Sequence, residues 1–269
     1  MLVVIKVGGS ILGEGLDSSI IDDILEVSKN NKIILVHGGG RAVTDMANKL
    51  GKVQKFIVSP NGIRSRYTDL ETVKIYTMVM TGTINKDIVV ALQKIGIPAI
   101  GLSGVDGGII RADRKKKLTV VDERGRKVVI DGGYTGKITK VDGCLITTLV
   151  NLKYIPVISP VALSEDFDYL NIDGDRTAAY VAGGVHADKV IFLTDVNGVI
   201  MNKEVVNRMT SREADALRPK IGFGMEKKVL ASLEALSMGV KASIISSGRI
   251  NKPITSALNY DGCTVISDE

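Results

Sequence analysis

The sequence contains two short apolar stretches that run directly into glycines, VIKVGGS at residues 4–10 and LVHGGG at residues 35–40. Both are rich in β-branched residues, which favours buried strands. A third glycine cluster, GLSGVDGG at residues 101–108, follows a similar stretch. Because glycine has no Cβ, the backbone N–H groups of such loops can converge on an anion, helped by the dipole of the helix that follows. The pattern therefore predicts strand–loop–helix units whose loops bind anions.

The alternation of apolar runs and helical patterns continues along the chain. Buried strands are expected at residues 2–7, 33–36, 99–102, 157–158, 190–193 and 243–245. Helices are expected near residues 17–29, 40–50, 68–80, 83–95, 143–153, 174–184 and 225–238. This order predicts an α/β fold with a largely parallel sheet and helices on both faces, in which ligands bind beyond the carboxyl ends of the strands.

The composition of the 269 residues is that of an ordinary globular protein, with 45% apolar and 24% charged side chains. It excludes a disordered or collagen-like chain. No apolar run approaches the ~18 residues needed to span a bilayer, and the N-terminus has the pattern of a first strand rather than a secretion signal. Two cysteines and two histidines leave little for a disulfide framework, a zinc site or a Ser-His-Asp triad. We therefore expect a cytoplasmic protein without a membrane partner.

The net charge of +5 is concentrated in one segment of the chain. Residues 111–140 carry ten basic and four acidic side chains, a net charge of +6, so the remaining residues carry −1. The region 117–141 is expected to hold most of these basic side chains on a β-hairpin, KLTVVDERGRKVVID, that turns at 123–126. Such a segment is either a solvated surface or a docking site for an acidic protein. Nucleic-acid binding is disfavoured, because Tyr134 is the only aromatic residue there.

Five motifs occur in a fixed order along the chain, namely VIKVGGS (4–10), LVHGGG (35–40), YLNIDGDRTA (169–178), LTDVNGV (193–199) and GMEKK (224–228). In this order they resemble the amino acid kinase family, which includes acetylglutamate kinase, aspartokinase and carbamate kinase. The segment SPNGIRSRYTD (59–69) and the basic hairpin are most similar to one branch of it. Members of that branch phosphorylate 2-aminoadipate or glutamate attached to a small acidic amino-group carrier protein. The resemblance implies a three-layer αβα sandwich, with an acyl-acceptor lobe at 1–160 and an ATP lobe at 161–269.

The reaction implied by the resemblance is transfer of the γ-phosphoryl group of ATP to a side-chain carboxylate, giving an acyl phosphate in lysine or arginine biosynthesis. A carboxylate with a pKa of about 4.3 is already ionised at neutral pH, so no general base is needed. The main requirement is to neutralise charge on the transferring oxygens, which suits lysines and backbone N–H groups. Two alternatives are an N-acetyl-L-glutamate kinase that acts on the free small molecule and a non-catalytic sensor of amino acids or nucleotides.

The catalytic residues implied by the resemblance are Lys6, Lys228, Asp175 and Gly9. Lys6 would stabilise charge on the acceptor side and Lys228 on the nucleotide side, while Asp175 organises both lysines and Gly9 holds phosphoryl oxygens. The sequence leaves two of these assignments open. Lys227 could take the place of Lys228, and an aspartate of this motif could instead cap the following helix, a role that we assign to Asp173.

The acceptor-binding residues implied are Gly39, Gly40, Arg64 and Asn171. Arg64 would clamp the α-carboxylate with its planar guanidinium, although Arg66 is a nearby competitor for that role. Asn171 would bind the α-amino or amide portion, unless it is a turn residue.

The nucleotide-binding residues implied are Thr194, Asp195, Gly198 and Met225, with Lys203 and the 222–225 loop as weaker candidates. ATP and Mg²⁺ are the implied cofactors, with magnesium held by ATP phosphates and water and no protein metal ligand. The residues expected to dock an acidic carrier protein are Arg111, Arg114, Lys115, Lys116 and Lys117. Relatives in the family also suggest a homodimer.

Overall fold

The computed structural model describes residues 1–269 apart from 14, 61, 63, 223 and 269. Its main sheet has eight strands in the order β16-β18-β17-β13-β1-β2-β10-β5. Neighbouring strands are parallel except β17 and β18. The strands are β1 Leu2–Val7, β2 Lys32–His37, β5 Ala99–Ser103, β10 Ile155–Ser159, β13 Lys189–Thr194, β16 Arg208–Met209, β17 Ala242–Ser247 and β18 Thr264–Ile266. The six strands predicted from the sequence are all confirmed in this sheet.

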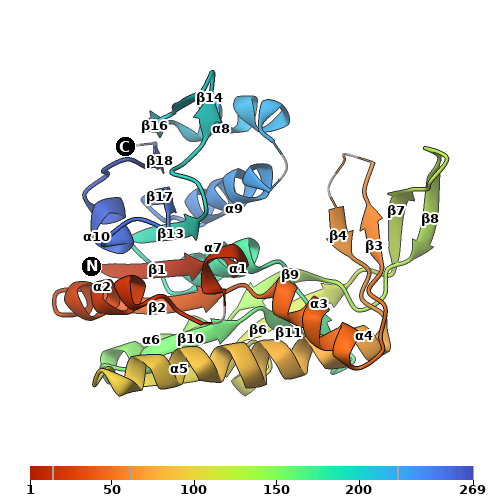
Figure 1. Cartoon of the computed structure of the whole chain (residues 1–269), viewed down its shortest axis with the longest axis horizontal. Helices are drawn as coiled ribbons and strands as arrows, with labels where there is room; N and C mark the ends of the chain where they lie inside the picture. The colour runs from red at the N-terminus through yellow and green to blue at the C-terminus, as the bar shows by residue number, and fades with distance from the viewer. Residues whose placement is uncertain (14, 61, 63, 223, 269) are drawn as a thin grey trace.

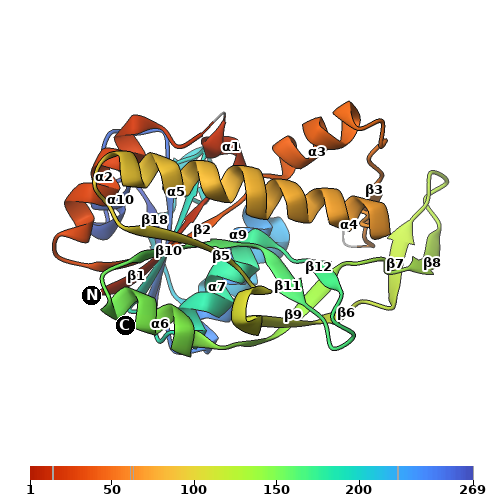
Figure 2. The same ribbon diagram turned by 90° about the horizontal axis from the view of Figure 1, so that it is seen from below.

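Helices cover both faces of the main sheet (Figures 1 and 2). One face carries α2 (Ser18–Ser28), α5 (Asn85–Lys94) and α10 (Pro253–Leu258), and the other carries α6 (Gly143–Asn151), α7 (Gly174–Gly184) and α9 (Met225–Ser237). Side chains alternate along β1, so that Val3 and Ile5 pack in the first apolar layer and Val4 packs in the second. The three-layer αβα sandwich is therefore confirmed.

The predicted helices at 68–80 and 83–95 form one continuous helix. It runs from α4 (Leu70–Thr77) through a π turn, η1 (Met78–Ile84), into α5, and Figure 2 shows it as a single long rod. The sequence suggested a break near 81–82, but the chain keeps right-handed helical dihedral angles at both ends of the π turn. The other helices are α1 (Gly9–Leu12), α3 (Gly40–Lys49), α8 (Ser211–Leu217) and the short turns η2 (Asp106–Gly108) and η3 (Arg218–Lys220).

Smaller sheets accompany the main sheet. A four-stranded sheet has the order β12-β11-β6-β9, formed by Tyr169–Asn171, Val161–Leu163, Ile110–Arg114 and Gly136–Val141. Two hairpins stand beside each other at one end of the molecule, β3–β4 (Phe56–Val58, Arg64–Arg66) and β7–β8 (Lys117–Val121, Lys127–Asp131) (Figure 1). The last pair is β14 (Ile200–Met201) with β15 (Glu204–Val205).

The basic hairpin is present but shorter than expected. It ends at Asp131, because residues 136–141 form β9 and pair with β6 instead. The hairpin itself carries four basic side chains, Lys117, Arg124, Arg126 and Lys127, against three acidic ones. The expectation that most of the positive charge lies on the hairpin is therefore wrong, and the rest lies on β6, β9 and the loop before β7.

The proposed boundary near residue 160 falls between two strands that lie close in sequence. β11 and β12 come after it, yet they pair with β6 or with each other in the sheet that also holds β9. The main sheet likewise combines strands from both sides of residue 160. The division into an acceptor lobe and an ATP lobe stays a prediction. Within the residues described, no helix has both the length and the apolar character that crossing a bilayer requires.

Candidate active site

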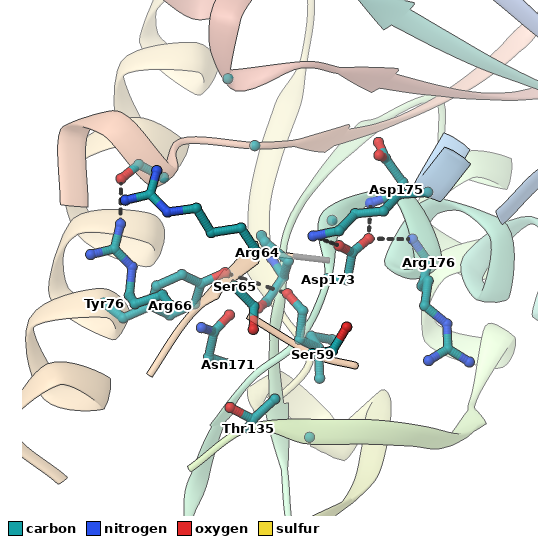
Figure 3. A pocket seen from close by; sticks show the side chains of 18 of the residues that line it. Ser59, Arg64, Ser65, Arg66, Tyr76, Thr135, Asn171, Asp173, Asp175 and Arg176 are labelled. Atoms are coloured by element: carbon teal, nitrogen blue, oxygen red, sulfur yellow. Dashed lines mark hydrogen bonds and ion pairs between the residues drawn. The ribbon is translucent and has the colours of Figure 1, made fainter. Parts of the chain in front are cut away.

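A cavity of about 620 Å³ opens at the carboxyl ends of β1 and β2. Its base is formed by the two glycine loops and by the first turns of α7 and α9, and its sides are formed by the β3–β4 and β7–β8 hairpins. Figure 3 shows side chains of the β3–β4 hairpin, of β12 and of the start of α7 around the cavity. This is where a parallel α/β sheet is expected to bind a ligand.

Lys6, Asp175 and Lys228 meet at the base of this cavity. Lys6 follows Val4 by two positions on β1, so its side chain emerges on the face that α7 covers. Its Nζ lies 2.7 Å from Asp175 Oδ1 in the first turn of α7. Lys228 Nζ, from the first turn of α9, lies 3.2 Å from the other oxygen, Asp175 Oδ2. One carboxylate thus holds two ammonium groups side by side.

The electrostatics of this trio favour a charged Asp175. Burial alone would raise the pKa of its carboxyl group, but the charges of Lys6 and Lys228 outweigh burial and hold the pKa below its usual value. The three side chains are at most 13% exposed. Their formal charges sum to +1 in a site with little water, where a cation is most effective in stabilising developing negative charge.

Asp173 has the different role that the sequence left open. As N-cap of α7, its Oδ1 accepts hydrogen bonds from the N–H groups of Asp175 (3.0 Å) and Arg176 (3.1 Å). Its Oδ2 lies 3.8 Å from Lys227 Nζ. Lys227 and Lys228 therefore both line the cavity, and it is Lys228 that pairs with Asp175.

The two glycine loops touch each other across the base of the cavity. A Cβ on Gly9 would lie 2.9 Å from Gly39 N, and a Cβ on Gly38 would lie 2.7 Å from Gly9 N, so neither position tolerates a side chain. Gly39 also has a φ of +153°. In the part of the chain that the structure describes, the N–H groups of Gly9, Gly39 and Gly40 have no protein acceptor. They are available to bind oxygens of a ligand, as the sequence predicts.

Arg64 and Arg66 project from β4 into the same cavity but are held differently. Arg66 Nη2 donates to Gly40 O (2.7 Å) and to Thr44 Oγ1 (2.8 Å), so its guanidinium lies against the second glycine loop. Arg64 is exposed, with its guanidinium 4.2 Å from the centre of the Phe56 ring. Arg66 is thus closer to the loop that would hold a carboxylate.

Asn171 is the end residue of β12 and faces the cavity between these groups (Figure 3). Its side-chain amide donates to Thr68 Oγ1 at 2.9 Å, which fixes the orientation of its head group. Its backbone N–H donates to Tyr134 O. Asn171 is therefore a strand residue and not a turn residue.

Comparison with known proteins identifies the family. Residues 1–246 match the profile of the amino acid kinase family. The chain belongs to the amino acid kinase family. A protein of Nitrosopumilus maritimus shares 56% identity over 268 residues, which is all of both chains. A protein of Saccharolobus solfataricus named LysW-aminoadipate/LysW-glutamate kinase is 46% identical over 268 residues, covering 99% of this chain and 100% of its own length.

Solved structures with this fold are more distant in sequence. The protein smu.665 of Streptococcus mutans has a TM-score of 0.79 at 23% identity, with 100% of this chain and 99% of that chain covered. Carbamate kinase of Giardia has a TM-score of 0.70 at 17% identity, with the same coverage. These similarities show the fold, including the mainly parallel central sheet.

The predicted nucleotide residues lie at the end of β13, in the loop after β13 or at the start of α9. Thr194 ends β13 and donates to Asp195 Oδ1 at 3.1 Å. Met225 is the first residue of α9; Gly224 just before it, and Lys227 and Lys228 of α9, line the cavity. None of the four predicted nucleotide residues is among the cavity-lining residues that the structure describes.

Gly198 and the weaker nucleotide candidates have other surroundings. A Cβ on Gly198 would overlap Thr264 Oγ1, so this glycine is explained by its close approach to β18. Lys203 has a φ of +70° between β14 and β15. Of the 222–225 loop, Phe223 lies outside the described residues, as do Asn61 and Ile63 of the 59–69 motif.

The five predicted docking residues differ in exposure and in contacts, with Lys116 and Lys117 exposed and the other three partly buried. Arg111 Nη1 donates to Ser164 O at 3.4 Å, and its guanidinium lies 5.6 Å from the Phe167 ring. Arg114 Nε donates to Gly133 O at 2.7 Å, with its guanidinium 4.2 Å from the Tyr134 ring. Both arginines therefore hold neighbouring segments of their own chain together.

The three lysines that follow also separate. Lys115 is half-buried and lines the cavity. Burial lowers the pKa of its ammonium group, and the nearby charge of Arg176 lowers it further. Lys116 and Lys117 are exposed. Lys115 thus faces the cavity, while its two neighbours remain on the surface.

Two buried polar residues around the cavity were missed by the sequence prediction. The Tyr76 hydroxyl donates to Pro160 O at 3.2 Å, and His37 Nδ1 lies 2.9 Å from Gly38 O. The position of His37 directly before three glycines could have indicated that its side chain lies beside the glycine loop. Tyr76 carries no such signal, because its partner is 84 residues away in the chain.

Proposed function

We propose that this protein transfers the γ-phosphoryl group of ATP to the side-chain carboxylate of 2-aminoadipate or glutamate carried by a LysW-type carrier protein, in lysine or arginine biosynthesis. The observation that carries the proposal is the buried trio of Lys6, Asp175 and Lys228 at the base of a cavity lined by two glycine loops. The full-length similarity to a LysW-aminoadipate/LysW-glutamate kinase supports the choice of acceptor.

The trio would act mainly through charge. An ionised acceptor carboxylate attacks the γ-phosphorus directly, so the barrier lies in bringing two anions together and in the charge spread over the transferring oxygens. Lys6 would meet the acceptor side and Lys228 the nucleotide side, and Asp175 keeps both ammonium groups at fixed positions. The N–H groups of Gly9, Gly39 and Gly40 would hold the remaining oxygens.

Magnesium would enter the site with the nucleotide. Among the residues described, no group of three or more His, Cys, Asp or Glu side chains is placed to hold a metal ion. The carboxylate nearest the transfer site, Asp175, is already engaged with two lysines. This donor set fits an ion held by ATP phosphates and water, which would neutralise phosphate charge.

The acceptor end of the cavity would recognise the α-carboxylate through Arg66 or Arg64 and the amide portion through Asn171. We assign the carboxylate first to Arg66, because its guanidinium already lies against Gly40. The four nucleotide candidates come from the C-terminal half of the chain, in the segment proposed as the ATP lobe, 161–269. Arg64 and Arg66 come from the proposed acceptor lobe, 1–160, while Asn171 reaches the cavity from beyond that boundary.

The two hairpins at the rim of the cavity suit a substrate that is attached to another protein. A tethered acceptor must reach the base while its carrier stays outside, and Lys116 and Lys117 are exposed at the start of β7. Lys115 would contact the anionic acceptor inside. We propose that the carrier surface which docks there is acidic, since opposite charge speeds encounter.

A homodimer is the proposed assembly. β5 is an edge strand of the main sheet, and edge strands offer unpaired N–H and C=O groups to a second copy. Exposed apolar side chains lie on the adjoining elements, Val90 of α5 and Leu152 and Tyr154 just before β10. Light scattering is expected to give twice the chain mass of 28.7 kDa.

The proposed activity is tested by trapping the acyl phosphate with hydroxylamine. The purified protein is given ATP, Mg²⁺ and one acceptor at a time: carrier-linked aminoadipate, carrier-linked glutamate and free N-acetylglutamate. Hydroxamate from the carrier-linked acceptors is the expected result. Turnover of free N-acetylglutamate alone would make the protein an acetylglutamate kinase, and no turnover of any acceptor would leave a sensor.

A further inference from the structure

His37 is a fully buried side chain at the end of β2, directly before the glycine loop 38–40. Its Nδ1 lies 2.9 Å from Gly38 O, and its Nε2 lies 3.0 Å from Ser159 Oγ. Burial lowers the pKa of the imidazole to about 4, an effect that Lys6 and Lys86 reinforce, so the ring is neutral at physiological pH. Because a carbonyl oxygen can only accept, Nδ1 carries the hydrogen and donates it to Gly38.

On the far side of the imidazole, Nε2 carries no hydrogen and accepts from the groups around it. The single hydrogen of the Ser159 hydroxyl can go to Nε2 or to the carbonyl oxygen of Met80 within the π turn, which lies 3.1 Å from Ser159 Oγ. Asn85, the first residue after the π turn, donates to Val157 O at 2.8 Å and lies 3.4 Å from His37 Nε2. Both Ser159 and Asn85 are at most 1% exposed. π turns are rare, and many occur at functional sites.

The π turn also contacts the glycine loop directly. A Cβ on Gly39 would overlap Ile84 Cδ1 and would lie 3.0 Å from Met80 Sδ, so the turn packs closely against that residue. On its other side, Gly39 contacts the backbone of Gly9. The loop is thus enclosed by the first glycine loop, the π turn and the imidazole.

The hydrogen bond from His37 fixes one peptide plane. In a trans peptide, the C=O of Gly38 and the N–H of Gly39 belong to the same rigid unit and point in opposite directions. Holding the carbonyl therefore also sets the direction of the N–H. Two consecutive glycines have little steric preference of their own, so without this bond the plane could rotate.

We propose that His37 is a positioning residue, which holds the Gly38 carbonyl so that the N–H of Gly39 stays directed at the ligand oxygens in the cavity. This role rests on the proposed phosphoryl transfer. His37 touches neither substrate nor nucleotide and exchanges no proton. Through its contacts with Ser159 of β10 and with Asn85, it would restrict the motion of the glycine loop 38–40, which has no side chains of its own to do so.

Three variants of His37 separate the two ends of the ring. In H37N the amide nitrogen takes the place of Nδ1, in H37Q it takes the place of Nε2, and H37L keeps the bulk but neither bond. We expect kcat of H37L to fall about ten- to a hundredfold, as misplacement of a group near the chemistry does. The KM for ATP is expected to stay within twofold, and H37N to recover at least half of the loss on a logarithmic scale, with H37Q recovering less.

A purely structural role predicts another order. H37N creates a larger void than H37L, so packing alone would make H37N the worse variant in both thermal stability and activity. Equal activity of H37L and the wild type, or H37N no better than H37L, would overturn the proposal. S243A removes an equally buried hydroxyl from β17 and is the matched control, with kcat expected within twofold of the wild type.

A second readout does not depend on the substrate. The backbone ¹⁵N order parameter of Gly39, measured without any ligand, is expected to fall in H37L and to be restored in H37N. If the wild type phosphorylates no carrier-linked acceptor but Gly39 still responds in this way, the proposed function fails and the positioning role stands. An unchanged order parameter in H37L with normal wild-type turnover would remove the positioning role alone.

Discussion

The base of the cavity and its rim are built from different parts of the fold. At the base, Lys6, Asp175 and Lys228 come from a central strand and from two helices on one face of the main sheet, and all three are largely buried. The rim consists of two hairpins, each a two-stranded sheet of its own, with exposed side chains such as Arg64 and Lys117. The base can therefore fix the positions of charges, while the rim can differ with the size of the acceptor without disturbing them.

The largest expected effect comes from removing a charge at the base. Lys6→Met deletes one ammonium group and leaves Asp175 with a single partner, so kcat is expected to fall by about 10²–10³-fold. The hydroxamate assay measures this loss. Lys32→Met, on the exposed start of β2, is the control and is expected to keep wild-type activity. If kcat of Lys6→Met were within tenfold of the wild-type value, the claim that the base supplies the catalytic charges and the rim does not would be contradicted.

A charge reversal on the rim should act on the partner and spare the chemistry. Lys116→Glu combined with Lys117→Glu is expected to lower kcat/KM for a carrier-linked acceptor by roughly tenfold at low salt. The loss should shrink at higher ionic strength, because the charges are exposed. The KM for ATP is expected to stay unchanged.

A matched charge change elsewhere tests whether location matters. Lys29 and Lys49 are also exposed, and replacing both by Glu alters the net charge by the same amount. This control is expected to leave kcat/KM within twofold. If both double variants lose activity equally, net charge rather than the rim governs encounter with the carrier.

The free energy of unfolding should depend more on contacts between the helices of the main body than on the hairpins at the rim. Buried Asp23 of α2 accepts hydrogen bonds from the N–H groups of Ile254 (2.6 Å) and Thr255 (3.0 Å) at the start of α10. Asp23→Ala is expected to lower the free energy of unfolding by about 1–3 kcal/mol, since these donors lose their acceptor. Arg124→Ala at the hairpin tip should change it by less than about 0.5 kcal/mol. Urea unfolding measures both, and a larger loss from Arg124 would contradict the distinction.

The smallest expected effect is a pH dependence at the base. The pKa of Asp175 is lower in the folded protein than in the unfolded chain, because Lys6 and Lys228 outweigh burial. Its ionisation therefore stabilises the fold above the unfolded pKa of about 3.9, and this contribution disappears as the pH falls through the folded value. The stability difference between the wild type and Asp175→Asn should thus shrink below pH 4 in urea unfolding. A difference that stays constant from pH 7 to pH 3 would contradict this.

The sequence was most informative where the local pattern determines the structure. β-branched runs predicted six strands of the main sheet but not β16 and β18, and the alternation along β1 places Lys6 on the face covered by α7. The pair Lys227-Lys228 could not be resolved, since which lysine reaches Asp175 depends on how α9 is rotated against α7. Both lysines reach the cavity, and only the packing of the two helices shows which one reaches Asp175.

Other parts of the site depend on contacts between distant segments. The contact of His37 with Ser159 joins residues 122 apart in sequence, and the π turn has no sequence pattern that distinguishes it from an ordinary helix. Lys115 was grouped with its neighbours because they share a charge. Its entry into the cavity follows from the pairing of β6 with β9, which also shortened the predicted hairpin.

The contact between the two glycine loops bears on the distance between the groups that would react in the cavity. These loops end adjacent parallel strands, β1 and β2, and their backbones meet without any intervening side chain. In the proposed reaction, the separation of the oxygens held by the two loops would therefore follow the spacing of hydrogen-bonded strands, about 4.8 Å. Exchanging side chains can alter which molecules enter and how strongly they bind. The proposed transfer distance would depend on the sheet itself.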